Sequence, residues 1–247
     1  MKKVLIINDF VSYGKMAGRM MDAILSYKNY DVFFIPTALI ANNFSYGKNA
    51  FLDPTSYLED TLKNWQDLGF TYDLIFIGYI ANKDQRDILI SFINSLEKKP
   101  FIFVDPIMGD NGSLYTGLSD DIIDNYRSLI SLADLISPNA TEAKLLDMDL
   151  KNASKSYLIT SKNEGDSYFV EGYDKDIFRV YFEKLPSNLA GTGDMFDGFI
   201  ILNLLKGLSL KEACERSVKV ISKIYKLNMD QGSNQSINIE KYLNLID

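Results

Sequence analysis

The segment with the clearest chemical potential is Gly191-Thr192-Gly193-Asp194, which precedes a strongly apolar stretch. Glycines let a backbone approach a ligand closely, and the free N–H groups at a helix start attract anions, phosphate above all. Asp194 would lie beside that anion, where a carboxylate can serve as general base toward a hydroxyl that attacks the phosphate. Alternatively, Asp194 is a first-turn acid that complements the helix dipole, and the glycines form a tight turn. The tetrapeptide alone leaves both interpretations open.

Several other chemistries are excluded by residues that the 247-residue chain lacks. It contains no histidine, which removes Ser-His-Asp and Cys-His nucleophile systems and histidine-containing zinc sites. Its one cysteine allows neither an internal disulfide nor an all-cysteine metal site. The Gly-x-x-x-x-Gly-Lys-Ser/Thr phosphate loop is missing, and Phe196 stands where a dinucleotide-binding fingerprint needs its third glycine. Carboxylates, hydroxyls, lysines, backbone amides or a bound ion must therefore perform the chemistry.

A second group of polar residues could hold a cation next to such a phosphate. Asp105, Asp110 and Glu142 are the acidic candidates, and Asn139 lies three residues before Glu142 at an expected strand-to-helix junction. Mg²⁺ binds one or two carboxylates together with phosphate oxygens and waters, so it could join these carboxylates to a nucleotide. Equally, Asn139 and Glu142 could be a helix cap and a first-turn acid without any ligand.

The elements that must position these residues alternate between strands and helices. Near-continuous apolar runs predict strands buried on both faces, as in a parallel sheet covered by helices. This alternation predicts an α/β fold, a three-layer α/β/α sandwich with a mostly parallel central sheet, and one domain spanning residues 1–247. The expected strands are 4–7, 32–35, 74–77, 101–104, 135–136 and 157–159, with an antiparallel hairpin at 168–170 and 177–182. The expected helices are 14–27, 55–68, 83–98, 120–132, 141–146, 192–206, 209–227 and 239–246.

Polar residues follow each expected strand, where an open α/β sheet binds its ligands. Taken singly, each position is also consistent with an ordinary polar turn. Six such positions along one sheet edge favour a cleft lined by carboxylates and hydroxyls. The residues are Asn8 and Asp9, Pro36 and Thr37, Gly78 and Tyr79, Asp105 and Asp110, Ser137 and Asn139, and Thr160 and Ser161.

In this order along nearly the whole chain, these motifs resemble the ribokinase superfamily and, within it, the pyridoxal kinase branch. The superfamily resemblance rests on Gly191-Thr192-Gly193-Asp194, on Asp105-Pro106-Ile107-Met108-Gly109-Asp110 and on Ser137-Pro138-Asn139-Ala140-Thr141-Glu142. The branch resemblance rests on Val11-Ser12-Tyr13-Gly14, Thr37, Asn42, Tyr46-Gly47-Lys48, Gly78-Tyr79, Gly112-Ser113-Leu114-Tyr115 and Ile159-Thr160-Ser161.

The resemblance implies that ATP phosphorylates the 5′-hydroxymethyl group of pyridoxal, pyridoxine or pyridoxamine. Asp194 would be the base, and the amides of Gly191, Thr192, Gly193 and Asp194 would hold the transferring phosphoryl group. The implied substrate residues are Asp9, Thr37, Asn43 and Tyr79, and the implied metal residues are Asp105 and Glu142. The implied nucleotide residues are Asp110, Tyr115, Asn139, Thr160 and Ser161. One residue departs from the branch, since Asp9 stands where pyridoxal kinases carry a serine that touches the pyridine ring.

The same resemblance implies Mg²⁺, a monovalent cation such as K⁺, and a homodimer. Two alternatives share the catalytic motif: a kinase of hydroxymethylpyrimidine, and a catalytically weak relative that only binds the vitamin. The formal net charge of −7 argues against a nucleic-acid or anionic-membrane partner. The short apolar run at 4–7 is far below the length of a signal peptide or membrane span, so a cytoplasmic location is expected.

Overall fold

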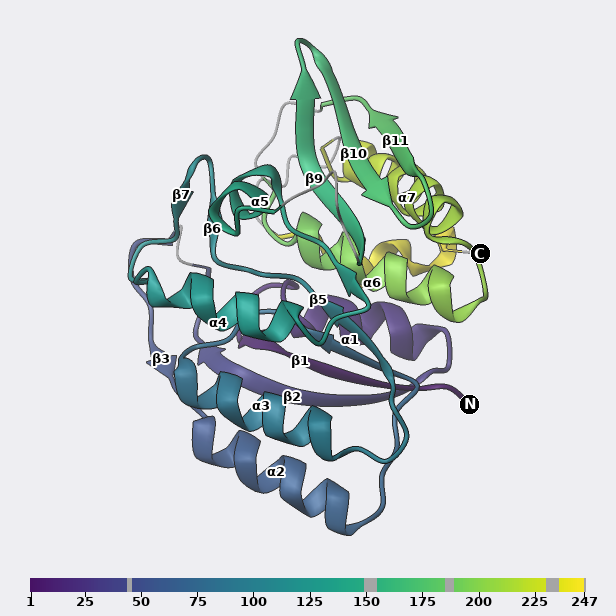
Figure 1. Ribbon diagram of the computed structural model, residues 1–247. Coiled ribbons are helices and arrows are strands. Elements are labelled where there is room, and N and C mark those ends of the chain that lie inside the picture. The colour runs from purple at the N-terminus through teal and green to yellow at the C-terminus, as the bar shows by residue number, and fades with distance from the viewer. Residues whose placement is uncertain (44–45, 149–154, 185–188, 230–235, 247) are drawn as a thin grey trace.

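A nine-stranded sheet runs through the middle of the protein in the order β11-β10-β9-β8-β5-β4-β1-β2-β3 (Figure 1). The computed structural model describes all residues except 44–45, 149–154, 185–188, 230–235 and 247. The strands of this sheet are β1 (Lys3–Val11), β2 (Asp31–Ile40), β3 (Phe51–Leu52), β4 (Leu74–Ile77), β5 (Phe101–Val104), β8 (Leu135–Ile136), β9 (Ser156–Glu164), β10 (Ser167–Tyr173) and β11 (Ile177–Phe182). A separate small hairpin consists of β6 (Gly109–Asp110) and β7 (Ser113–Leu114).

The middle of the sheet is parallel, from β2 through β1, β4, β5 and β8 to β9. Strands β3, β10 and β11 add antiparallel edges. The helices that connect and cover these strands are α1 (Gly18–Tyr27), α2 (Thr55–Asp67), α3 (Lys83–Ser95), α4 (Asp121–Ile130), α5 (Ala140–Leu145), α6 (Thr192–Leu205), α7 (Leu210–Met229) and the 3₁₀ helix η2 (Ile239–Leu245). The predicted three-layer α/β/α sandwich is confirmed.

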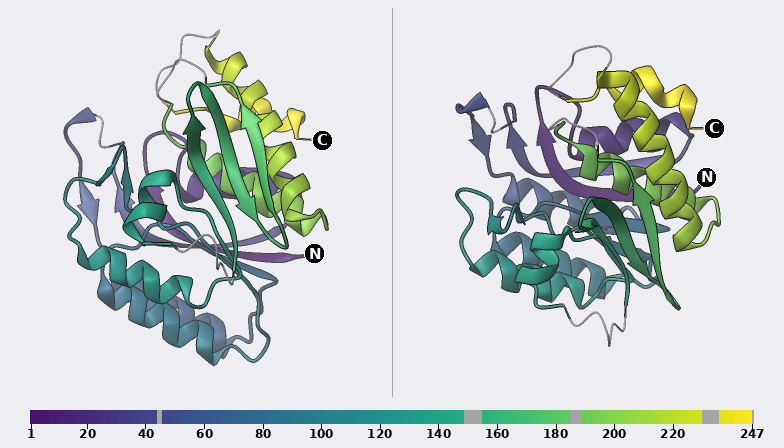
Figure 2. Two further views of the ribbon diagram at one scale, coloured as in Figure 1. Left: turned by 45° about the horizontal axis from the view of Figure 1, so that its top comes forward. Right: turned by 90° about the horizontal axis from the view of Figure 1, so that it is seen from above.

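Alternate residues of each buried strand pack on opposite faces of the sheet, as the two-residue repeat of a strand requires. Val4 and Ile6 of β1 belong to the hydrophobic cluster under α1, α6, α7 and η2. Leu5 and Ile7 belong to the cluster under α2, α3 and α4. Figure 2 shows the two helical layers on either side of the sheet. Among the described helices, none combines the length and the hydrophobicity needed to cross a bilayer.

The chain reverses its direction of progress across the sheet between β1 and β4. It moves from β1 outward to β2 and β3, then crosses back to β4 on the other side of β1 and continues to β5, β8 and β9. Ligands of open α/β sheets bind at the carboxyl ends of the strands at such a switch point. The residues after Ile7 of β1 and after Ile77 of β4 are therefore placed to form a site.

The expected ends of the first two strands were wrong. Strand β1 continues to Val11 and β2 to Ile40, so Asn8, Asp9 and Thr37 lie inside strands and not in turns. The register between the two strands shifts between Asn8 and Phe10, which marks an irregularity at Asp9. A bulge of this kind re-aims side chains, and it lets polar residues occupy a strand that has left the apolar core.

Two further boundaries differ from the prediction. The expected hairpin is the outer part of a three-stranded meander, because β9 extends to Glu164 and carries Thr160 and Ser161 within it. Helix α1 begins at Gly18 and not at residue 14, since Gly14 has φ +96° and Ala17 has φ +53°, which no α-helix accommodates.

Candidate active site

The first turn of α6 presents free backbone N–H groups, as the glycine motif predicts. Gly191 is the N-cap in the left-handed conformation, with φ +85° and ψ 12°. The first helical hydrogen bond runs from Met195 N to the Gly191 carbonyl at 3.0 Å. The N–H groups of Thr192 and Gly193 therefore have no partner within the helix and can bind an anion.

Asp194 is held in place by the chain segment before α1. Its Oδ2 accepts a hydrogen bond from Ala17 N at 2.8 Å, which explains why Ala17 adopts its unusual conformation just ahead of that helix. Burial raises the pKa of Asp194 above its ordinary value, while the Ala17 N–H and the Asn8 side chain oppose this rise. The result is an oriented carboxylate with increased basicity.

Asn8 joins the ends of β1 and β4 beside Asp194. It is fully buried, and its Oδ1 accepts from Asp9 N and from Tyr79 N, each at 2.9 Å. A Cβ on Gly78 would lie 2.5 Å from this Oδ1, so the asparagine requires glycine at that position. Asn8 followed the first apolar run in the sequence, but nothing there distinguished it from an ordinary turn residue.

Three of the four predicted substrate residues lie on these neighbouring strand ends. Thr37 is buried, and its Oγ1 donates to the Tyr79 carbonyl at 2.6 Å. Burial raises the pKa of the Tyr79 hydroxyl, and the negative charges of Asp9 and Asp53 raise it further. Asn43 lies further along, after β2, where its carbonyl accepts from Tyr46 N at 3.2 Å.

Asp9 has an electrostatic environment that disfavours its charge. Burial, and secondarily the carboxylate of Asp194, raise the pKa of Asp9 from 3.8 to about 7. Both effects act against a second negative charge in a poorly solvated place. Asp9 and Asp194 thus lie close enough to influence each other, which brings the substrate and catalytic candidates into one site.

This shift predicts that the stability of the protein falls as the pH rises from about 4 to about 7. In that window folded Asp9 retains a proton that the unfolded chain has released; below it both states are protonated, and above it both are ionised. Urea unfolding should give a free energy lower at pH 8 than at pH 5, with Asp9 contributing on the order of a few kcal/mol.

The variant Asp9→Asn should reduce this pH dependence without abolishing it, because Glu142 and Asp197 also have pKa values raised to about 7 by burial. Asp60→Asn, the same change at an exposed position of α2, is the matched control. Equal pH dependence in Asp9→Asn and the wild type would contradict the shift.

A buried pair of carboxyl groups lies near the same helix turn. Asp197, one turn after Asp194, shares a hydrogen bond with Asp105, which follows β5. Burial, followed by the charges of Asp197 and Glu142, raises the pKa of Asp105 well above its ordinary value. Asp197 was not predicted as a site residue, although a carboxylate inside an otherwise apolar helix is a signal visible in the sequence.

Glu142 and Asn139 form the helix cap that the sequence analysis kept as an alternative. Asn139 Oδ1 accepts from Thr141 N and Glu142 N, and Glu142 Oε2 accepts from Asn139 N, which makes a reciprocal capping box at the start of α5. Glu142 Oε1 accepts from Met108 N at 3.0 Å and from Gly109 N at 3.3 Å. The carboxylate thereby connects α5 to the loop that contains Asp105.

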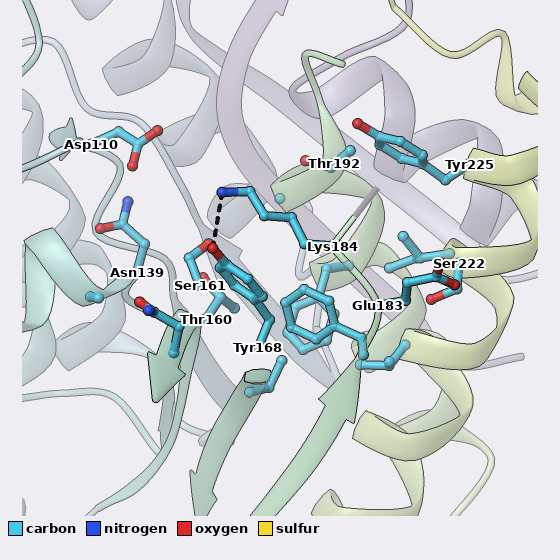
Figure 3. Close-up of a pocket in the computed structure, with 18 of the residues that line it drawn as sticks. Asp110, Asn139, Thr160, Ser161, Tyr168, Glu183, Lys184, Thr192, Ser222 and Tyr225 are labelled. Carbon is cyan, nitrogen blue, oxygen red and sulfur yellow. Dashed lines mark hydrogen bonds between the residues drawn. The ribbon is translucent and has the colours of Figure 1, made fainter. Parts of the chain in front are cut away.

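Most of the predicted nucleotide residues line one pocket of about 620 Å³, together with Thr192 and Gly193 (Figure 3). Asp110, Asn139, Thr160 and Ser161 are among its residues, but Tyr115 is not. Tyr115 is 45% exposed and is attached through its backbone N–H to the Met108 carbonyl at 2.9 Å. The remaining walls come from β10, β11 and α7 and include Tyr168, Val170, Phe182, Lys184, Ser222 and Tyr225.

The predicted metal residues Asp105 and Glu142 are close enough to interact electrostatically, but they do not form a complete set of metal ligands. Within the described part of the chain, no three acidic, histidine or cysteine side chains gather as ligands for one metal ion. Asp105 and Glu142 are nevertheless near enough for Glu142 to raise the pKa of Asp105. Two neighbouring carboxylates suit an ion that takes its other ligands from phosphate and water.

Together these features define a class of protein: an α/β kinase that transfers a phosphoryl group to an alcohol at a helix N-terminus. The chain belongs to the phosphomethylpyrimidine kinase family, whose model it matches over residues 23–238. This match and the fold also confirm the resemblance to the ribokinase superfamily and its pyridoxal kinase branch.

The relatives include pyridoxal kinases. A Schizosaccharomyces pombe protein described as a pyridoxal kinase is 28% identical and aligns with 81% of this chain and 67% of its own length. The pyridoxal kinase of Ovis aries is 26% identical, with 89% and 83% covered. A Bacteroides thetaiotaomicron protein described as a phosphomethylpyrimidine kinase, crystallised with pyridoxal, superposes with a TM-score of 0.91 at 28% identity; the match covers 100% of this chain and 96% of that one.

Proposed function

We propose that this protein transfers the γ-phosphoryl group of ATP to the 5′-hydroxymethyl group of a B6 vitamer: pyridoxal, pyridoxine or pyridoxamine. The observation that carries the proposal is the position of the first turn of α6 between two groups of residues. Thr192 and Gly193 line the 620 Å³ pocket, whereas the carboxylate of Asp194 interacts electrostatically with Asp9. A phosphate bound at the turn would thus lie between a nucleotide and an alcohol.

In the proposed reaction Asp194 takes the proton of the vitamer hydroxyl as its oxygen attacks the γ-phosphorus of ATP. The bond between that phosphorus and the bridging oxygen breaks, and ADP leaves with the electron pair. The amides of Gly191, Thr192, Gly193 and Asp194 stabilise the transferring group. Asp9, Thr37, Asn43 and Tyr79 orient the ring, and Asp110, Tyr115, Asn139, Thr160 and Ser161 bind the nucleotide.

Asp105 and Glu142 are the proposed residues for Mg²⁺. Burial is the main cause of their raised pKa values, and nearby negative charge adds to it: Asp197 and Glu142 act on Asp105, and Asp110 acts on Glu142. A divalent cation would offset this negative charge. When bound, Mg²⁺ neutralises phosphate charge during transfer. We further propose a monovalent cation such as K⁺, a single domain spanning residues 1–247, a homodimer and a cytoplasmic location.

A second candidate substrate is hydroxymethylpyrimidine, the alcohol whose phosphate ester is the phosphomethylpyrimidine in the description of the matching family. Both substrates are heteroaromatic alcohols, so the phosphate-transfer residues do not separate them. Discrimination between the pyridine and the pyrimidine ring would depend on Asp9, Thr37, Asn43 and Tyr79. The pyridoxal bound by the B. thetaiotaomicron relative supports the vitamer as the preferred substrate.

The test is turnover of each B6 vitamer and of hydroxymethylpyrimidine side by side with MgATP, following both ADP and the phosphorylated product. For at least one vitamer we expect kcat/KM to exceed that of hydroxymethylpyrimidine by about tenfold or more. A preference for the pyrimidine would overturn the vitamer assignment. Tight vitamer binding without ADP formation would support the third alternative, a relative that only binds the vitamin.

A further inference from the structure

The 620 Å³ pocket contains a cation that the site described above does not use. Lys184 follows β11, and its ammonium group extends into the space bordered by Ser161, Asp110 and Thr192 (Figure 3). Among the described residues that line the pocket, Lys184 is the only basic one, whereas Asp110 and Glu183 are acidic. A ligand that carries several negative charges would need this cation to enter.

The contacts of Lys184 hold its charge in position without neutralising it. Its Nζ donates to the hydroxyl of Tyr168 at 3.2 Å and lies 4.7 Å from the centre of that ring. In the described part of the chain, no carboxylate lies within 4.0 Å of this ammonium group. A cation held by a neutral phenol and an aromatic face keeps its capacity to bind an anion.

Three other basic residues on the strands and helix that border the pocket are paired with carboxylates. Lys162 and Arg179 both bind Glu171, at 2.6 Å and 3.1 Å. Lys226 binds Glu183 at 2.7 Å, which neutralises the acidic residue next to Lys184 in the sequence. The charge of Lys184 therefore remains available to a ligand in the pocket, whose walls also include the apolar Val170 and Phe182.

We propose that Lys184 binds the polyphosphate of the nucleotide and that the Tyr168 hydroxyl positions its ammonium group before the nucleotide enters. This inference rests on the proposed function, because it assumes that the pocket takes a nucleoside polyphosphate. The apolar Val170 and Phe182 would receive the base, and Lys184 lines the same pocket as Thr192 and Gly193, whose amides would bind the terminal phosphate.

Calorimetric binding of ADP and of adenosine tests the proposal without requiring turnover. Lys184→Gln should weaken ADP binding by about tenfold, since a charge-assisted hydrogen bond in a wet pocket contributes at the low end of its range. Adenosine binding should not change, because adenosine has no phosphate. Lys184→Arg should restore most of the ADP affinity, and Tyr168→Phe should cause a smaller loss than Lys184→Gln.

Lys83→Gln is the matched control, since it removes the same charge from an exposed position of α3 far from the pocket. Raising the salt concentration should weaken ADP binding more in the wild type than in Lys184→Gln. An equal loss of affinity for ADP and for adenosine in Lys184→Gln, or unchanged ADP affinity in that variant, would overturn the proposal. Failure of the wild type to bind ADP would overturn it as well. Lys184-dependent ADP binding without vitamer phosphorylation would sustain it while refuting the proposed function.

Discussion

Asp194→Asn is expected to lower kcat for phosphorylation of the vitamer by about 10²- to 10⁴-fold, the usual cost of losing a positioned general base. The asparagine side chain can still offer an oxygen to Ala17 N, which Asp194 Oδ2 contacts at 2.8 Å in the wild type. Its second atom is then an amide nitrogen, which cannot accept a proton from an alcohol. Steady-state rates with saturating vitamer and MgATP give the measurement, and ADP binding should stay close to that of the wild type.

The choice of asparagine separates catalysis from folding. Asp194→Ala would leave the Ala17 N–H buried without an acceptor, at a cost of about 1–3 kcal/mol of stability. We therefore expect a lower Tm for Asp194→Ala and a nearly unchanged Tm for Asp194→Asn, with kcat strongly reduced in both variants. If Asp194→Asn folds normally and retains the wild-type kcat, then Asp194 is not the general base and is only a first-turn acid of α6.

The fold was largely predictable from the sequence because its strands are short apolar runs separated by amphipathic helices. The run 4–7 has every side chain buried, as a strand covered on both faces requires. The continuation of that strand to Val11 was not predictable, because Asn8 and Asp9 have the composition of a turn. Their strand conformation depends on pairing with β2 and on the register shift at Asp9, which are long-range effects.

The candidate site was predicted best where its residues are adjacent in the sequence. Gly191 to Asp194 form one turn, so their local spacing already indicated a candidate anion site, with an ordinary helix start as the alternative. Asp197 was missed because its partner Asp105 is distant in the sequence and meets it only through the order of β5 and α6. The proposed role of Lys184 could not be predicted from the sequence, because it depends on a contact with Tyr168 in a neighbouring strand.

Gly193→Val is expected to reduce turnover by about 10²-fold or more, the cost of removing a donor that stabilises a developing charge. A Cβ on Gly193 would meet no atom within 4 Å, so the valine fits the protein but occupies the space beside the free N–H groups. Valine keeps the backbone N–H, so turnover falls because its side chain blocks the approach of phosphate to that donor. Helix propensity does not oppose the change, because glycine is less favourable than valine inside a helix. Vitamer binding and Tm should therefore remain near wild-type values.

Gly191→Ala is the matched comparison, and its main expected effect is on the stability of the folded protein. Gly191 has φ +85°, and its Cβ would lie 3.0 Å from Met16 Cβ, so alanine there costs about 1–2 kcal/mol of stability through backbone strain alone. One glycine thus maintains the turn and the other keeps the space for phosphate. Thermal unfolding and turnover of the two variants distinguish these roles, and near-normal activity of Gly193→Val would show that the phosphoryl group binds elsewhere.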